Sequence, residues 1–274
     1  MAEAARNRTI GFIGLGSQGA PMAERMLQAG RLMVWARRPE SAADLVGKGA
    51  GLAASVEELG AACRHVGVCV VDDAGVLDVC DRLIPAMQPG SVLAIHSTIL
   101  PQTCEDLERR AAERGILLLD APVSGGGPAA AAGTLTVMCG GTQEAFDSAR
   151  PVLESFGSRI VLLGPAGAGQ RAKIVNNALM AANMGLAFSA LGMADALGMD
   201  RAALAELIQH SSGRSFGFEV FARLPTPAAF AHGARLLHKD VNLLGAILPG
   251  GEGDNALALA AMPFLDATGV TKEG

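Results

Sequence analysis

The chain is poor in charged residues and has no cluster of one sign. Charged side chains make up 18% of its 274 residues, hydrophobic ones make up 50%, and the formal net charge is −5 at pH 7. No run rich in lysine and arginine occurs, whereas binding to a phosphate backbone requires a clustered positive surface. The composition therefore predicts a folded protein with a sizeable core, and it argues against disorder and against a nucleic-acid partner.

Metal-ligand spacings are also missing. The cysteines are odd in number and form no CxxC pair, so we interpret them as buried thiols in a reducing compartment. They are Cys63, Cys69, Cys80, Cys104 and Cys139. The first eight residues are polar and lack the apolar segment of a signal peptide. We therefore expect a cytoplasmic protein without a metal site.

One long stretch, residues 178–199, is almost free of charge. It is rich in alanine, glycine and methionine rather than leucine and isoleucine, and it contains Asn183 and Asp195. This composition favours a helix buried between protein neighbours over a membrane span. Because small residues let helices pack closely, we expect this helix at a domain or subunit contact. A homodimer or homotetramer is the corresponding expectation.

Short apolar runs alternate with amphipathic stretches in the first part of the chain. Such alternation with short links is typical of parallel βαβ units covered on both faces. The predicted strands are residues 9–13, 32–35, 66–71, 91–95, 117–119, 135–139 and 160–163, and helices are predicted at residues 21–29, 41–48, 102–114 and 143–156.

A glycine-rich link at residues 164–169 breaks this pattern. Only helices are predicted after it. The first, residues 170–197, would extend about 40 Å at 1.5 Å per residue. Shorter helices are predicted at residues 201–209, 234–248 and 256–267, and residues 248–254 form a loop that is unusually rich in glycine.

The first predicted strand leads into a GxGxxG turn, and a helix follows it. In a dinucleotide site the first glycine permits the tight turn, the second lets the backbone approach the pyrophosphate, and the third allows the helix to pack closely. The helix N-terminus supplies N–H donors to the anion. The cofactor-binding turn consists of Gly14, Leu15, Gly16, Ser17, Gln18 and Gly19. An ordinary glycine-rich turn is the alternative interpretation.

These elements together predict the fold class. We expect an α/β Rossmann dinucleotide-binding domain over residues 1–165. An all-α domain built on a long interdomain helix should follow over residues 166–274, and it would carry substrate-binding and oligomerisation surfaces.

Cofactor choice depends on the residues that follow the second strand. An NAD site usually has Asp or Glu there for the ribose 2′-hydroxyl, but residues 34–39 contain no acid. They contain Arg37 and Arg38, whose guanidinium groups suit a 2′-phosphate. We therefore predict NADP, with NAD still possible. A pair of solvated surface arginines is the alternative.

Three further segments carry polar groups that a dinucleotide site does not need. Residues 120–126 put Ser124 and exposed backbone N–H groups on a turn that can hold a carboxylate. Lys173 and Asn177 are four residues apart on the long helix and therefore share a face. A charged pair, residues 239–240, lies in the otherwise apolar segment 236–248.

Five sequence segments, distributed along nearly the whole chain, match the motifs of a known family in the same order. They are GFIGLGSQGAPMA (11–23), HSTILP (96–101), DAPVSGGGPAAAAGTLTVMCGG (120–141), GAGQRAKIVNN (167–177) and LLHKDVNL (236–243). With them the chain resembles the β-hydroxyacid dehydrogenase family, the 3-hydroxyisobutyrate dehydrogenase-like proteins. The resemblance implies a Rossmann domain like that of the NADP-binding 6-phosphogluconate dehydrogenases, followed by a helical domain.

The resemblance implies a role for several residues. Ser124, Gly125 and Gly126 would bind the substrate carboxylate, Lys173 would be the general acid/base, and Asn177 would help position the substrate. A surface lysine and a plain turn serine are the alternatives for Lys173 and Ser124.

The remaining implied contacts are with the cofactor. Thr98 would lie beside the nicotinamide, and Lys239 and Asp240 would lie where the helical domain closes over cofactor and substrate. A salt bridge within the helix, from Lys239 or Arg235, is the alternative for Asp240.

The predicted activity is NADP-dependent interconversion of a small β-hydroxy acid and its semialdehyde or keto acid. A lysine can move the hydroxyl proton in either direction, and a bound carboxylate fixes the reacting carbon. An imine or other carbonyl reductase is one alternative, although the chain has no tyrosine to act as the acid. A non-catalytic dinucleotide-binding module is the other.

Overall fold

The computed structural model describes residues 9–249 and 255–270 and divides into two compact units. One unit ends at Lys173 and the other begins at Ile174. This division falls beyond the expected boundary after residue 165, because the first turn of the long helix is hydrogen-bonded to the α/β unit. The N-terminal residues 1–8 and most of the glycine-rich loop, residues 250–254, lie outside the described residues.

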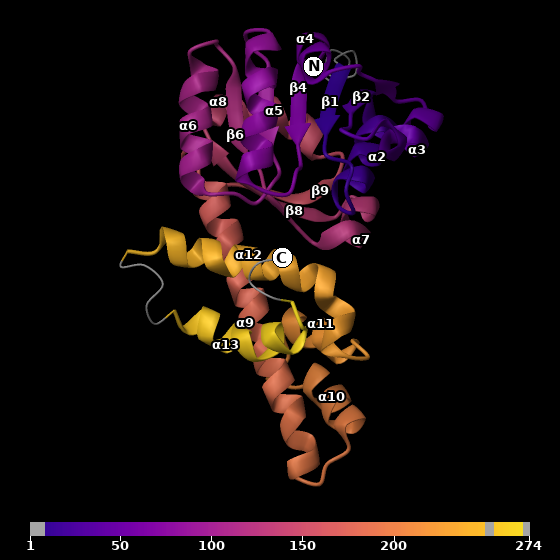
Figure 1. Cartoon of the computed structure of the whole chain (residues 1–274), viewed down its shortest axis with the longest axis vertical. Helices are drawn as coiled ribbons and strands as arrows, with labels where there is room; N and C mark the ends of the chain where they lie inside the picture. The colour runs from indigo at the N-terminus through magenta and orange to yellow at the C-terminus, as the bar shows by residue number, and fades with distance from the viewer. Residues whose placement is uncertain (1–8, 250–254, 271–274) are drawn as a thin grey trace. The chain divides into compact units, whose positions relative to one another are not determined.

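The α/β unit is built on a nine-stranded sheet (Figure 1). Its strand order is β3-β2-β1-β4-β5-β6-β8-β7, with β9 paired to β8, and the strands from β3 to β6 are parallel. The strands are β1 (Thr9–Ile13), β2 (Arg31–Trp35), β3 (Gly51–Leu52), β4 (His65–Val68), β5 (Val92–Ile95), β6 (Leu117–Asp120), β7 (Val123–Ser124), β8 (Leu135–Gly141) and β9 (Gly157–Leu162).

Helices cover both faces of this sheet, as the alternating pattern predicts (Figure 1). They are α2 (Gly19–Ala29), α3 (Ala43–Gly47), α4 (Val56–Ala62), α5 (Asp73–Ala86), α6 (Pro101–Ala112), α7 (Gly126–Ala132) and α8 (Gln143–Leu153). Phe12 on β1 packs into the core with α2, α7 and α8, and the adjacent Ile13 packs into the core with α4, α5 and α6. This alternation follows from the two-residue period of a strand.

Part of the sheet departs from the predicted parallel arrangement. β8 runs antiparallel to β6 and to β7, and β9 then pairs with β8 in parallel. Between β7 and β8 the chain has only the seven-residue helix α7 and short links. This connection is too short to cross the sheet and return in parallel. The chain therefore turns back, and β8 lies antiparallel.

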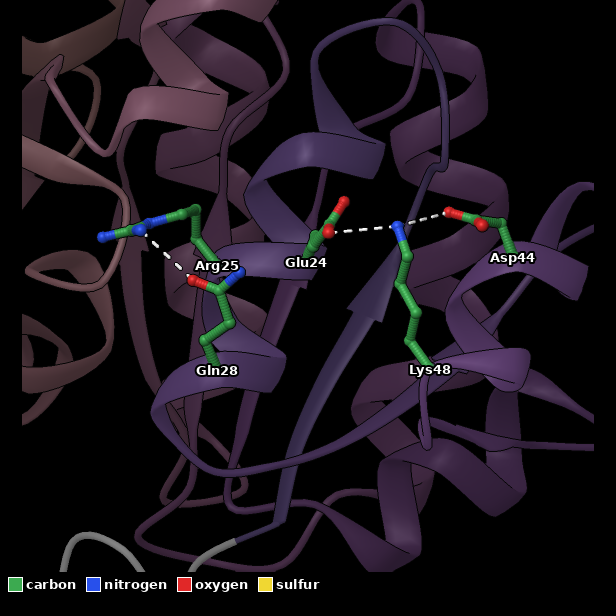
Figure 2. Close-up of polar contacts among 5 residues, drawn as sticks. All are labelled: Glu24, Arg25, Gln28, Asp44 and Lys48. Atoms are coloured by element: carbon green, nitrogen blue, oxygen red, sulfur yellow. Dashed lines mark hydrogen bonds and ion pairs between the residues drawn. The ribbon is translucent and has the colours of Figure 1, made fainter.

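Exposed ion pairs join helices α2 and α3 on the surface. The Lys48 ammonium lies 3.0 Å from Glu24 and 2.8 Å from Asp44 (Figure 2). Hydrogen bonds to the two carboxylates raise the pKa of Lys48. Arg25 donates to Gln28 on α2, 3.1 Å away, in the same view. Because solvent screens exposed pairs, these contacts contribute little to stability.

The helical unit packs around the greater part of one long helix, α9 (Ala168–Ala196). Its other helices are α10 (Arg201–Gln209), α11 (Phe216–Ala222), α12 (Ala231–Ile247) and α13 (Ala256–Ala267), with a short 3-10 helix at Pro227–Phe230. Gly185 of α9 approaches α13 so closely that a Cβ would lie 1.8 Å from the Ala260 carbonyl oxygen. Small residues therefore permit close helix packing here.

α9 is long and apolar enough to cross a membrane by length and composition alone. In its most apolar window, 44% of the residues are buried inside the protein. Ala178, Ala181 and Met184 belong to the core of the helical unit. These contacts are those of a helix packed against protein, as the composition predicts.

Candidate active site

The glycine turn between β1 and α2 has the geometry of a dinucleotide cradle. Gly14 has φ +102°, and a Cβ there would lie 2.0 Å from the carbonyl oxygen of Cys69. A Cβ on Gly19 would lie 1.9 Å from the carbonyl oxygen of Gly14. A Cβ on Gly16, by contrast, would meet nothing within 4 Å. The first and third glycines thus close the turn, and the second leaves space in which a pyrophosphate fits.

The two candidate 2′-phosphate ligands follow the end of β2. Arg37 and Arg38 are both exposed, and neither forms an ion pair with another described residue. Two unneutralised guanidinium groups at the end of this strand suit a phosphate monoester.

The Thr98 segment follows β5 and is held from both sides. The Ser97 hydroxyl accepts a 2.8 Å hydrogen bond from the backbone N–H of Val70. The fully buried Gln170 side chain donates to the Ser97 carbonyl oxygen at 2.9 Å and accepts from the Ile99 N–H at 3.1 Å. Gln170 therefore fixes the backbone on both sides of Thr98. Spacing along the chain does not predict this role of Gln170, because only these long-range contacts reveal it.

The proposed carboxylate turn lies next to the glycine turn. Gly125 and Gly126 have φ values of +134° and +72°, which favour glycine over other residues. A Cβ on Gly127 would lie 3.0 Å from the carbonyl oxygen of Ser17. The partly buried Ser124 pairs with β8 just before this point. The fold thus brings the segments around residues 17 and 124–127 together, although a hundred residues separate them in the chain.

Asp120, at the end of β6, anchors the start of α9. Its carboxylate is fully buried and accepts backbone N–H groups from Gly167 at 2.8 Å and Gln170 at 2.9 Å. Burial raises the pKa of Asp120 to about 6, and the backbone N–H donors, including that of Gly169, oppose this rise. At neutral pH the carboxylate is therefore largely ionised, as a cap on a helix N-terminus should be.

Lys173 lies on α9 shortly after this anchor and is half-buried. Burial raises the pKa of the Cys69 thiol to about 11, and the nearby Lys173 ammonium opposes this rise. Cys69 follows β4 and packs against Gly14. Lys173 is therefore brought to the end of the sheet where the glycine turn lies.

The remaining candidates belong to the helical unit. The Asn177 side-chain amide donates to a carboxylate oxygen of Asp240, and Asn176 donates to the Asn177 side-chain oxygen at 3.1 Å. Asp240 is buried, and the Lys239 ammonium lies 3.4 Å from its second oxygen. Asp240 thus orients Asn177, a contact that the sequence pattern did not predict. Asn177 itself is one turn beyond Lys173 on the same helix.

Comparison with known proteins agrees with this geometry. Residues 9–164 match the family described as the NAD binding domain of 6-phosphogluconate dehydrogenase. Residues 167–259 match the family described as the NAD-binding domain of NADP-dependent 3-hydroxyisobutyrate dehydrogenase. The chain belongs to the β-hydroxyacid dehydrogenase family. It is an NAD(P)-dependent dehydrogenase that acts on CH–OH groups.

Individual relatives support the same assignment. An NAD-dependent L-serine dehydrogenase of Pseudomonas aeruginosa is 40% identical over 86% of this chain and 84% of its own length. The structure of a Mycobacterium tuberculosis 3-hydroxyisobutyrate dehydrogenase with L-serine is similar with a TM-score of 0.83, at 29% identity over 94% of this chain and 93% of that one. A Streptomyces aurantiacus imine reductase, with a TM-score of 0.70 and 21% identity over 97% of both chains, shares the fold.

Proposed function

We propose that this dehydrogenase interconverts a small β-hydroxy acid and its semialdehyde or keto acid, with NADP as the preferred cofactor. The proposal is carried by the closeness of the 124–127 turn to the glycine turn at Ser17. A carboxylate held at the first turn would have its β carbon near the nicotinamide of a cofactor whose pyrophosphate is held at the second turn. L-serine, named with two of the relatives, is itself a 3-hydroxy acid.

The chain's own residues would bind, orient and move a proton. When bound, the nicotinamide accepts or supplies the hydride. Residues 14–19 would hold its pyrophosphate, and Ser124 with the backbone of residues 125–126 would hold the substrate carboxylate. Lys173 Nζ would take the hydroxyl proton during oxidation and return it during reduction. Fixed orientation of the alcohol carbon supplies much of the rate enhancement.

The helical unit would contribute orientation. Asp240 fixes the amide of Asn177, so this amide presents one defined end to a ligand. Lys239 lies beside the same carboxylate. We propose that Asn177 contacts substrate and that the Lys239–Asp240 pair supports it. Thr98 would contact the nicotinamide from the segment that Gln170 holds.

Arg37 and Arg38 support the preference for NADP. Both are exposed and lack acidic partners among the described residues. The segment from Val34 to Pro39 contains no acid to bind a ribose 2′-hydroxyl. We also propose that the enzyme works in the cytoplasm, in agreement with its cofactor and its five free cysteines.

Substitution of Lys173→Ala tests the proposal most directly. We expect the variant to lose most turnover of 3-hydroxy acids and to bind NADPH with nearly unchanged affinity. Wild-type protein should be assayed on L-serine, 3-hydroxyisobutyrate and short semialdehydes, each with NAD(H) and NADP(H), and on cyclic imines. Retained turnover in Lys173→Ala, or faster reduction of imines than of semialdehyde acids by the wild type, would refute the proposal.

A further inference from the structure

A single carboxylate connects the end of β6 to the start of α9. Asp120 accepts N–H groups of Gly167 and Gln170, one with each oxygen. Its surroundings are tight: a Cβ on Gly140 would lie 2.5 Å from one carboxylate oxygen, and a Cβ on Gly169 would lie 2.7 Å from the other. Asp120 is thus enclosed, and its two hydrogen bonds set both the starting residue and the rotation of the helix.

Gln170 connects the same helical turn to a second segment. Its backbone is held by Asp120, and its side chain bridges the Ser97 carbonyl oxygen and the Ile99 N–H. The Ser97 hydroxyl is in turn fixed by the N–H of Val70, next to Cys69. The Gln170 side chain therefore joins the first turn of α9 to the segment after β5, and Ser97 joins that segment to the end of β4.

Lys173 is three residues after Gln170, on the next turn of α9. A rotation or shift of the first turn of α9 would therefore move Lys173 directly. Asp120 also begins the segment that reaches Ser124 four residues later. The carboxylate thus ties the helix that carries the lysine to the turn that would bind the substrate.

We propose that Asp120 and Gln170 are positioning residues. They hold the first turn of α9 so that Lys173 faces the reacting hydroxyl, and Gln170 also holds Thr98 in position to contact the nicotinamide. The proposal rests on the proposed function, which assigns proton transfer to Lys173. Neither residue needs to touch substrate. Burying a carboxylate is costly unless it is hydrogen-bonded. The hydrogen bonds of Asp120 are directional, so they fix the position of the first turn of α9, whereas an apolar contact would let the helix shift.

The test uses Asp120→Asn and Gln170→Met in the full-length protein. Asp120→Asn replaces one acceptor oxygen by a donor group, and Gln170→Met removes both side-chain hydrogen bonds at similar volume. Asp200→Asn is the matched control, because Asp200 caps α10 by accepting the Ala203 N–H at 2.7 Å. Five quantities are measured: Tm, the Kd for NADPH, amide exchange of the ligand-free protein, and kcat and KM with L-serine or 3-hydroxyisobutyrate.

We expect both variants to fold and to bind NADPH with a Kd within about twofold of wild type. Amide exchange should accelerate at residues 167–173, and in Gln170→Met also at residues 97–99. The kcat should fall by about 10- to 100-fold, the scale expected for small misplacement of a reacting group, with little change in KM. The deuterium isotope effect on kcat should rise, because the chemical step becomes slower. Asp200→Asn should leave kcat, KM and the Kd for NADPH at the wild-type values, because Asn caps a helix about as well as Asp.

Other outcomes separate the two proposals. A lower Tm with wild-type kcat would mean that the pair is structural only, and it would overturn the positioning role. Unchanged amide exchange at residues 167–173 would overturn it as well. If Asp120→Asn does not fold, Gln170→Met decides by the same criteria. Retained turnover in Lys173→Ala would instead refute the proposed function, whatever the two positioning variants do.

Discussion

Gly127 lies so close to Ser17 that a Cβ on Gly127 would come within 3.0 Å of the Ser17 carbonyl oxygen. This contact joins the glycine turn that follows β1 to the turn between β7 and α7. The distance between a bound cofactor and a bound substrate carboxylate would therefore depend on how little space residue 127 occupies.

Enlarging residue 127 should impair both binding sites together. We expect Gly127→Val to push the two turns apart and to lower kcat/KM by about tenfold, since misplacement of a reacting group is costly. The KM values for cofactor and substrate should both rise. Ala131→Val is the control, because Ala131 is an exposed residue of the same helix. Steady-state kinetics that leave both KM values unchanged in Gly127→Val would contradict this relationship.

Removing the two guanidinium groups should change cofactor preference. Charge-assisted hydrogen bonds contribute about 1.5–3 kcal/mol each, so Arg37→Ala and Arg38→Ala should each lower kcat/KM for NADP by about tenfold or more. The kcat/KM for NAD should stay near the wild-type value. Arg31→Ala serves as the control, because Arg31 is exposed at the opposite end of β2. Equal losses with both cofactors would exclude a 2′-phosphate contact.

Two buried histidines should make the protein sensitive to acid. Burial and the nearby His96 lower the pKa of His65 to about 3, and burial lowers the pKa of His96 to about 4, although its hydrogen bond to the Ala121 carbonyl opposes the shift. The pKa values of both histidines in the folded state lie below the unfolded value near 6.5. Their contribution to the free energy of unfolding is therefore complete above pH 6.5. It falls as the pH drops from there toward 3–4.

Between pH 6.5 and pH 5 the free energy of unfolding should fall by about 2 kcal/mol for each of the two histidines. We expect His65→Leu to reduce this dependence, because neither ring nitrogen of His65 has a hydrogen-bond partner among the described residues. His65 also borders a cavity of about 40 Å³ with Ile10 and Val92, into which a leucine can relax. Urea unfolding at pH 7 and pH 5 measures the effect, and His210→Leu is the exposed control. Parallel pH profiles for His65→Leu and wild type would rule out this cause.

We propose that the enzyme is a homo-oligomer that buries the outer side of α9. Large apolar side chains are exposed along that helix at spacings that place several of them on one side: Val175, Leu179, Leu186 and Met193. The double variant Leu186→Glu/Met193→Glu should elute from gel filtration as a monomer, whereas Leu52→Glu, at an exposed position of β3, should not. A wild-type mass equal to one chain would refute the proposal.

Sequence patterns predicted best the helices and strands whose ends are set by neighbouring residues in the chain. β1, α10 and α13 begin and end as expected, and the two helices have side-chain caps, Asp200 and Asn255. β4 ends at Val68 instead of residue 71, because the Val70 N–H bonds to Ser97 rather than to a strand. The sequence gives no sign of this, since the partner is 27 residues away. α11 was not predicted, because seven residues are too few to establish a helical period.

The residues of the candidate site also fall into two groups, those that the sequence predicts and those whose roles depend on long-range contacts. The glycine turn and the turn at Ser124 were predicted from residue types and spacing, and the role of Lys173 was implied by the family resemblance. Asp120 and Gln170 belong to the quoted motifs, but their roles depend on contacts across 50 and 73 residues, which spacing does not encode. The orientation of Asn177 by Asp240 is a contact of the same kind, across 63 residues.

The Asp120 cap has a further consequence for the link that precedes α9. Most helices begin where a residue of the preceding loop caps them, so a change of loop length shifts the helical register. Here the cap belongs to the sheet, and the starting turn of α9 is fixed by β6. The loop between Gly164 and Gly167 can therefore gain or lose a residue without rotating the helix. The direction in which Lys173 points does not depend on the length of this loop.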